Sequence, residues 1–167
     1  MQHLILLRHS KAVRHHEAPD DLSRGLTARG RREAGEAGAA IAALGLTPSA
    51  GLISPSLRTR ETWKLASAAM PWQPKAIVSE GLYSAGPEDI WDLAEATGAE
   101  GVIVVGHNPG LGELVAHLIQ QSHARSKGAL ALMEHLPTSG FAAFELTGET
   151  FEAPGPNLLG WGRLRED

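Results

Sequence analysis

Four short apolar segments along the chain have the composition of strands. They are residues 4–7, 51–53, 76–79 and 101–106, and the last contains Val102-Ile103-Val104-Val105. The continuous apolar runs in residues 4–7 and 101–106 are typical of strands that are buried on both faces, as in a parallel sheet. We therefore predict a strand over each segment.

Between these strands, apolar residues recur at the spacing of a helix. Thr27 has the side chain of an N-cap, and the residues that follow it predict a helix with an apolar face. Further helices are predicted over residues 57–69, which end before a proline, and over residues 87–96, which begin at one. Asn108-Pro109 is expected to supply the N-cap and first residue of a helix that buries Leu111, Leu114, Val115, Leu118 and Ile119.

The last part of the chain predicts a β-hairpin at one edge of the sheet. Residues 140–146 and 149–153 can pair around the turn Thr147-Gly148. Strands alternate with helices before it, which indicates an α/β fold: a three-layer α/β/α sandwich with a mostly parallel central sheet. The chain has 167 residues with no repeat or linker, so we expect residues 1–167 to form a single domain.

Composition removes several classes of function. The chain has no cysteine, which excludes disulfides, thiolate zinc sites and a cysteine nucleophile. The formal net charge of −4 provides no bulk attraction for nucleic acid or an anionic membrane, so neither is expected as a partner. The first residues have no basic leader and no apolar run is long enough to cross a bilayer, so a cytoplasmic protein is expected.

Charged and imidazole side chains follow the predicted strands. The segments Arg8-His9-Ser10-Lys11, residues 54–58, residues 80–83 and residues 106–110 each come directly after a strand. In open α/β sheets, ligands bind beyond the carboxyl ends of the strands. We therefore expect two histidines, two arginines and a glutamate to meet at one rim of the sheet.

Such a group of side chains is suited to phosphate chemistry. Arginine binds phosphate oxygens through its planar guanidinium, and a helix that begins near Pro109 would offer free backbone N–H groups. Neighbouring cations lower the pKa of a histidine, which leaves a neutral imidazole as a nucleophile at pH 7. The chain has no Gly-Lys pair for a P-loop, no aspartate directly after a strong strand, and no histidine pattern typical of a metal site.

Four ordered segments resemble the histidine phosphatase superfamily, the group that contains phosphoglycerate mutases and acid phosphatases. They are Leu7-Arg8-His9-Ser10-Lys11-Ala12, Arg24-Gly25-Leu26-Thr27, Ser54-Pro55-Ser56-Leu57-Arg58-Thr59-Arg60-Glu61-Thr62 and Val105-Gly106-His107-Asn108-Pro109-Gly110. The short chain and Pro137-Thr138-Ser139-Gly140 resemble its compact SixA-type phosphohistidine phosphatase branch. The resemblance implies a phosphoglycerate mutase-like fold.

The resemblance also implies a role for individual residues. His9 would accept the phosphoryl group as a phosphohistidine intermediate that water then hydrolyses. Arg8, Arg58 and His107 would bind the phosphoryl oxygens and stabilise their charge during transfer. Arg24 would add a contact to the phosphate from the first loop.

One position departs from the family pattern, and at a second position the role of the residue is open. Ser10 stands where many members have glycine, which is acceptable if its backbone angles are ordinary. Glu80 stands where many members carry the proton donor. A phosphorylated imidazole needs little acid help to leave, whereas an alkyl phosphate needs a donor, so the direction in which Glu80 points bears on the class of substrate.

Three functions remain open on the sequence. The first is a metal-independent phosphatase without a cofactor, which acts on phosphohistidine of a partner protein and releases inorganic phosphate. The compact chain favours it, because little sequence remains to build a lid over a small substrate. The second is a small-molecule phosphomonoesterase or mutase at the same site, and the third is a phosphate-recognition module without catalysis.

Overall fold

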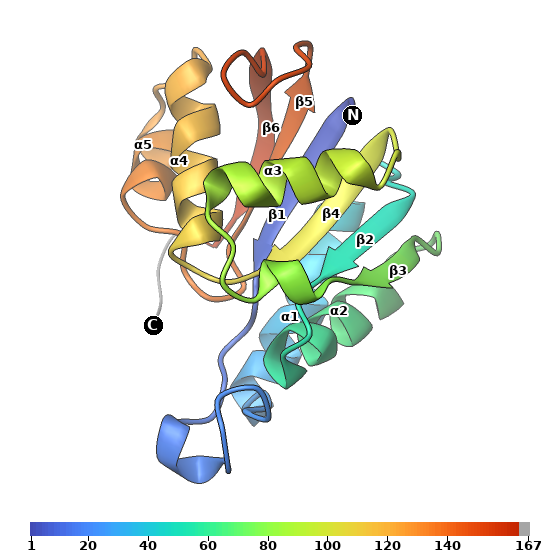
Figure 1. Cartoon of the computed structure of the whole chain (residues 1–167), viewed down its shortest axis with the longest axis vertical. Coiled ribbons are helices and arrows are strands. Elements are labelled where there is room, and N and C mark those ends of the chain that lie inside the picture. The colour runs from blue at the N-terminus through green and yellow to red at the C-terminus, as the bar shows by residue number, and fades with distance from the viewer. Residues whose placement is uncertain (164–167) are drawn as a thin grey trace.

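The computed structural model describes residues 1–163 as a six-stranded sheet with helices on both faces (Figure 1). The strand order is β3-β2-β4-β1-β5-β6. The first four strands in this order are parallel to one another, and β5 and β6 are antiparallel additions at one edge. The strands are β1 His3–Arg8, β2 Ala50–Ile53, β3 Lys75–Val78, β4 Gly101–Gly106, β5 Phe141–Leu146 and β6 Pro156–Gly162.

The centre of the sheet explains the uninterrupted apolar runs in the sequence. Strands β1 and β4 lie side by side, with Leu6 paired to Val104, and both are covered on each face. Leu4, Leu6 and Val102 point into one core, whereas Ile5 and Ile103 point into the other. A strand buried on both faces cannot alternate with polar residues, which confirms the prediction of a mostly parallel sheet.

The helices divide between the two faces of the sheet. Helices α1 (Ala28–Ala42) and α2 (Leu57–Ala68) pack on the core that contains Ile5, whereas α3, α4 and α5 pack on the core that contains Leu4 (Figure 1). These last three helices are α3 Pro87–Ala96, α4 Gly110–Gln121 and α5 Lys127–Glu134. The result is the predicted α/β/α sandwich, and its two cores keep the carboxyl ends of β1, β2 and β4 in place.

Two predictions of local structure were wrong, namely the start of α4 and the strand that pairs with β5. Helix α4 begins at Gly110 with Pro109 as its N-cap, while the side chain of Asn108 accepts a hydrogen bond from the N–H of Gly112. The partner of β5 is β6, not residues 149–153, which lie in the connection between the two strands. The two glycines and the proline of β6 weaken its strand signal, so the alternating residues before it were the better match by pattern.

The sequence also did not predict α5, a helix of 8 residues that buries only Ala129 and Leu132. A helix this short carries too few apolar repeats to stand out from a loop. No helix within residues 1–163 has the length and apolar character needed to cross a membrane.

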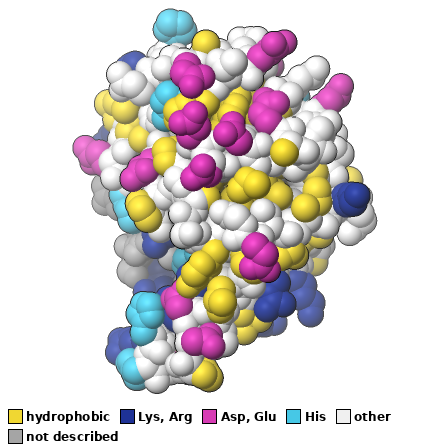
Figure 2. Space-filling view, viewed as in Figure 1, with side chains coloured by type: hydrophobic (Ala, Val, Ile, Leu, Met, Phe, Trp, Pro, Cys, Tyr) yellow, Lys and Arg dark blue, Asp and Glu magenta, His cyan; other side chains and the backbone are white. Residues whose placement is uncertain are grey.

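Surface charge is unevenly distributed over the molecule. Figure 2 shows Asp and Glu side chains gathered over the region of α3, whose exposed residues include Glu88, Asp89 and Asp92. Lys and Arg side chains lie on the side of α2 instead. On the face shown, the acidic side chains over α3 therefore lie apart from the basic side chains near α2.

Candidate active site

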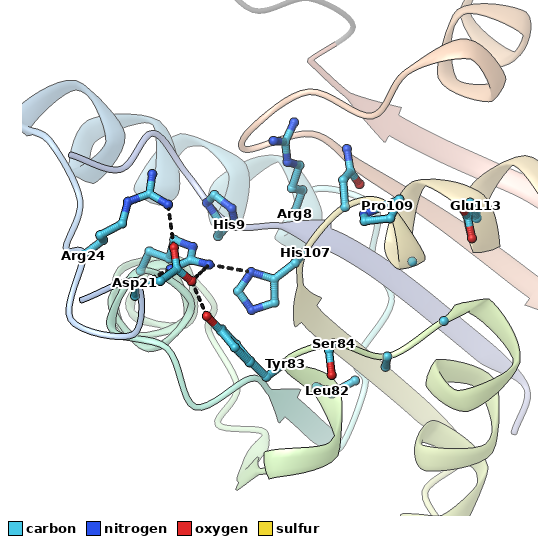
Figure 3. A pocket seen from close by; sticks show the side chains of 15 residues that line it. Arg8, His9, Asp21, Arg24, Leu82, Tyr83, Ser84, His107, Pro109 and Glu113 are labelled. Carbon is cyan, nitrogen blue, oxygen red and sulfur yellow. Dashed lines mark hydrogen bonds and ion pairs between the residues drawn. The ribbon is translucent and has the colours of Figure 1, made fainter. Parts of the chain in front are cut away.

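A cavity of about 580 Å³ lies at the carboxyl ends of the central strands. Arg8 and His9 enter it at the end of β1, and His107 enters it directly after β4 (Figure 3). Arg58 comes from the first turn of α2, and Arg24 comes from the loop between β1 and α1. The structure therefore brings together the two histidines and two arginines that strand order placed at one rim, and adds Arg24, which only the family resemblance implied.

His9 is held as a neutral imidazole with a defined tautomer. Its side chain is buried, and Nδ1 lies 2.8 Å from the carbonyl oxygen of Ser10. A carbonyl can only accept, so Nδ1 carries the proton and the lone pair is on Nε2. Burial lowers the pKa of His9 to about 3, and the positive charges of Arg8 and Arg58 act in the same direction. Nε2 is thus available as a nucleophile at neutral pH.

Ser10 fits its position with ordinary backbone geometry. Among residues 1–163, the non-glycine residues with positive φ are Ser139 and Arg163, so Ser10 is not in the region that favours glycine. Its N–H donates to Thr62 Oγ1 at 2.9 Å, and its hydroxyl oxygen accepts from Ser139 Oγ at 2.6 Å. The N–H of Ser139 donates to the carbonyl of His9 at 3.2 Å. Ser10 and Ser139 therefore fix the backbone on which the nucleophile stands.

His107 is also neutral, and its orientation is set by two partners. Nδ1 accepts a hydrogen bond from Arg58 Nη2 at 3.3 Å, so the ring proton is on Nε2, 2.6 Å from Ser54 Oγ. The pKa of His107 is lowered to about 4, and burial is the largest cause. The charges of Arg58 and Arg8 also lower it, and together they outweigh the charge of Asp21, which raises it. The two imidazole rings lie 5.4 Å apart between centroids, and both line the same cavity.

Asp21 and Tyr83 line the cavity although the sequence analysis did not predict them. Asp21 accepts hydrogen bonds from Arg24 Nη1 at 2.9 Å, from Arg58 Nη2 at 3.0 Å and from the hydroxyl of Tyr83. Partial burial alone would raise the pKa of Asp21, but these three donors outweigh it and hold that pKa well below its usual range. The same contact raises the pKa of Tyr83.

The reason for this omission lies in the loop that carries Asp21. Residues 9–26 have no periodicity, and the loop contains only a 3₁₀ turn, His15–Glu17, and a single bridge between Ala12 and Leu26. The signal that could have found Asp21 is its charge three residues before Arg24, in a loop that leads from the end of a central strand.

Glu80 lies outside the cavity. It begins the 3₁₀ turn Glu80–Leu82 and is exposed, while the residues that follow it, from Leu82 to Gly86, form the cavity wall. A different carboxylate, Glu113 on the first turn of α4, lines the cavity instead. Figure 3 shows Glu113 beyond Pro109 as seen from His9, at the far end from Arg24.

The start of α4 contributes less to anion binding than the sequence suggested. The N–H of Leu111 donates to the carbonyl of His107 at 2.9 Å, and the N–H of Gly112 donates to Asn108 Oδ1 at 3.0 Å. The N–H of Glu113 donates to the carbonyl of Pro109. These three N–H groups are not free, so the start of α4 offers fewer donors to an anion than a helix start without these internal bonds.

Residues 1–163 contain no group of three or more histidine or acidic side chains arranged to hold a metal ion. The chemical groups of the cavity include a neutral imidazole nucleophile, a second neutral imidazole, three arginines, two of which bind the carboxylate of Asp21, and the side chains of Tyr83 and Glu113.

Known proteins share both the sequence pattern and the fold. Residues 4–83 match the model of the histidine phosphatase superfamily, branch 1. Over 144 residues, the chain is 31% identical to an uncharacterized protein of Mycobacterium tuberculosis, which covers 85% of this chain and 88% of the relative.

Two solved structures of candidate SixA phosphohistidine phosphatases are similar over almost the whole chain. The one from Agrobacterium tumefaciens has a TM-score of 0.79 and 25% identity, and covers 97% of this chain and 98% of its own. The one from Nakamurella multipartitia has a TM-score of 0.78 and 26% identity, and covers 97% of this chain and 95% of its own.

Proposed function

The chain belongs to the histidine phosphatase superfamily, and from this premise we propose that it is a phosphatase that removes the phosphoryl group from phosphohistidine on a partner protein. Family membership and the SixA-like fold support phosphatase chemistry. The similarity to two candidate SixA phosphohistidine phosphatases supports the choice of phosphohistidine on a protein as the substrate.

In the first step, Nε2 of His9 attacks the phosphorus atom of the substrate. A new P–N bond forms to His9 while the P–N bond of the substrate breaks, and its electron pair stays on the departing ring nitrogen. The departing ring leaves as a neutral imidazole because the proton on its other nitrogen stays in place. The negative oxygens of the phosphoryl group face Arg8, Arg58 and Arg24 during this transfer. Because the nucleophile and the leaving group are both imidazoles, the exchange needs no large change in basicity.

In the second step, water attacks the phosphorylated His9. The water oxygen forms a bond to phosphorus, the P–N bond to His9 breaks, and its electron pair returns to Nε2. The proton that water gives up ends on inorganic phosphate or solvent. His9 is then neutral again, as its buried position requires.

The observation that carries the choice of substrate is the placement of the carboxyl groups. Glu80 is outside the cavity, and the carboxylate of Asp21 is held ionised by three donors. The hydroxyl of Tyr83 already donates its proton to Asp21. None of these groups is arranged to protonate an alkoxide, whereas a phosphorylated imidazole leaves without such a donor.

Phosphate release from matched peptides tests this proposal. The purified protein is given one peptide with phosphohistidine and one with phosphoserine at the same place, both in EDTA. We expect phosphohistidine to be hydrolysed with a kcat/KM at least about a hundredfold higher, since general acid catalysis contributes about 10²–10⁴-fold. Equal rates on both peptides, or no release from phosphohistidine, would contradict it.

Glu113 supports a phosphomonoesterase for small alkyl phosphates as the second candidate, because its carboxyl group lines the cavity. In that case Glu113→Gln removes hydrolysis of the alkyl phosphate, while Glu80→Gln, at an exposed site outside the cavity, leaves it unchanged. If neither substitution lowers hydrolysis of an alkyl phosphate, neither Glu113 nor Glu80 is the proton donor.

A further inference from the structure

One acidic residue of the cavity lining binds two of the arginines that line the same cavity. Asp21 receives hydrogen bonds from side chains of three separate segments: Arg24 in its own loop, Arg58 on α2, and Tyr83 after β3. A carboxylate beside a phosphate site repels the substrate through its charge, so its presence there requires a compensating benefit.

We propose that Asp21 is a positioning residue, which fixes the guanidinium of Arg58 in the orientation that receives the phosphoryl group. The proposal rests on the phosphatase function proposed above, because it concerns the same site. Asp21 acts through Arg58 and does not itself take part in bond making or breaking.

The orientation of the Arg58 guanidinium is set by very few hydrogen-bond partners. Its side chain is buried, and Nε has no hydrogen-bond partner. Nη1 donates to the carbonyl oxygen of Asp21 at 2.8 Å, and Nη2 donates to Asp21 Oδ2 at 3.0 Å. The remaining contact joins Nη2 to Nδ1 of His107 at 3.3 Å. Asp21 therefore holds both terminal nitrogens and directs the guanidinium toward the second histidine.

Asp21 is itself anchored independently of Arg58. The carbonyl of the next residue, Leu22, accepts from the N–H of Leu57 at 2.8 Å, which ties the loop to the start of α2. Arg24 donates through Nε to the carbonyl of Val13 at 2.9 Å and through Nη1 to Asp21 Oδ1 at 2.9 Å. These hydrogen bonds hold the loop in the position in which Asp21 contacts Arg58.

Tyr83 extends the same arrangement to the opposite wall. Its hydroxyl donates to Asp21 Oδ2, and its ring meets the ring of His107 edge to face, with 5.6 Å between centroids. Asp21 therefore contacts two of the neighbours of His107, Arg58 and Tyr83.

Positioning and simple charge predict opposite effects on anion binding. If only the charge of Asp21 mattered, removing it would tighten the binding of an anion. If Asp21 fixes Arg58, the same change weakens anion binding, because Nη2 loses its carboxylate partner and the guanidinium is held only through Nη1 and the main-chain carbonyl of residue 21. An asparagine has one acceptor oxygen, so at this position its NH₂ group faces at least one of the three donors.

Asp21→Asn is compared with Asp20→Asn, which removes the same charge one residue earlier. Asp20 is exposed, and its carboxylate accepts only from the N–H of Ser23 within the loop. The dissociation constant of inorganic phosphate is measured by calorimetry for both variants, and the kcat/KM for the phosphohistidine peptide is measured separately. For Asp21→Asn we expect weaker binding of phosphate and a kcat/KM lower by about 10–100-fold, as when a catalytic group is misplaced. For Asp20→Asn we expect values within about twofold of the wild type, typical of an exposed site.

Equal or tighter phosphate binding by Asp21→Asn, measured on folded protein, would overturn the proposal. Tyr83→Phe removes one donor and leaves both contacts between Asp21 and Arg58, so it covers the case in which Asp21→Asn does not fold. We expect its phosphate affinity to fall less than tenfold, and a larger loss would assign the positioning role to Tyr83 instead. Because binding of phosphate is measured by calorimetry without turnover, failure of the proposed phosphatase activity does not affect this result.

Discussion

The ring nitrogen Nδ1 of His9 lies 2.8 Å from the carbonyl oxygen of its neighbour Ser10. This short contact fixes the tautomer of the proposed nucleophile within the backbone of its own loop. Since the carbonyl of His9 also accepts from Ser139, the imidazole and the peptide that supports it are both held. The lone pair of Nε2 is thereby fixed before any substrate binds, which reduces the reorganisation that attack requires.

The first prediction is that His9 alone becomes phosphorylated. After incubation with a labelled phosphohistidine donor and an alkaline quench, we expect acid-labile, alkali-stable label on the wild type and none on His9→Ala. His123→Ala, a change of an exposed histidine outside the cavity, should carry as much label as the wild type. Turnover without any label on the wild type would remove the covalent step, and a protein with neither label nor turnover would be a phosphate-binding module.

The second prediction concerns stability against pH. The folded protein lowers the pKa of His9 to about 3 and of His107 to about 4, both below the ordinary value of 6.5. Below pH 6.5 the unfolded chain therefore binds more protons, and the free energy of unfolding falls as pH decreases toward 4. Each histidine contributes at most about 1.4 kcal/mol per pH unit in this window.

Urea unfolding at pH 7 and pH 5 measures this loss. His9→Ala should reduce the difference between the two pH values, because one buried group no longer takes up a proton on unfolding. His123→Ala again serves as the control and should leave the difference unchanged. A difference that is the same in the wild type and in His9→Ala would show that burial of this imidazole is not linked to folding.

The third prediction is that Ser54 orients His107. Ser54 is fully buried, and its hydroxyl oxygen is the partner of His107 Nε2. Ser54→Ala leaves that N–H without an acceptor, so we expect kcat/KM to fall by about tenfold or more, as when a supporting hydrogen bond is lost. The unfolding free energy should fall by about 1–3 kcal/mol.

Ser56→Ala is the matched control for Ser54. Ser56 caps α2 by accepting from the N–H of Thr59, and its hydroxyl has no contact with His107. This variant should lose about 1 kcal/mol of stability with little change in kcat/KM. If both substitutions lowered kcat/KM equally, the effect would come from displacement of α2 and not from loss of the hydrogen bond between Ser54 and His107.

Local signals predicted the parallel part of the fold and the residues that follow its strands. The four strands of the parallel region and α3 were found because each is a compact apolar or periodic segment with clear ends. Asp21 and Tyr83 were missed because their importance depends on three segments meeting in space, which no local pattern records. The partner of β5 was missed for a related reason, since β6 is specified by its packing and not by its strand propensity.

The last prediction separates two glycines of α1 that look equivalent in the sequence. A Cβ at Gly38 would collide with the backbone of Ala66, so this glycine permits the close approach of α1 and α2. Gly35 has nothing within 4 Å of the same atom. Gly35→Ala should therefore raise the unfolding free energy by about 0.5–1 kcal/mol through helix propensity.

Gly38→Ala gains the same propensity but must separate the two helices, and overpacking of this kind costs about 1–3 kcal/mol. We therefore expect a net loss of stability in urea unfolding. Because Arg58 stands on α2, we also expect this variant to bind phosphate more weakly, whereas Gly35→Ala keeps the affinity of the wild type. A stabilised Gly38→Ala would mean that α2 can move without cost, and the position of Arg58 would then depend on its contacts with Asp21 and not on the packing of its helix.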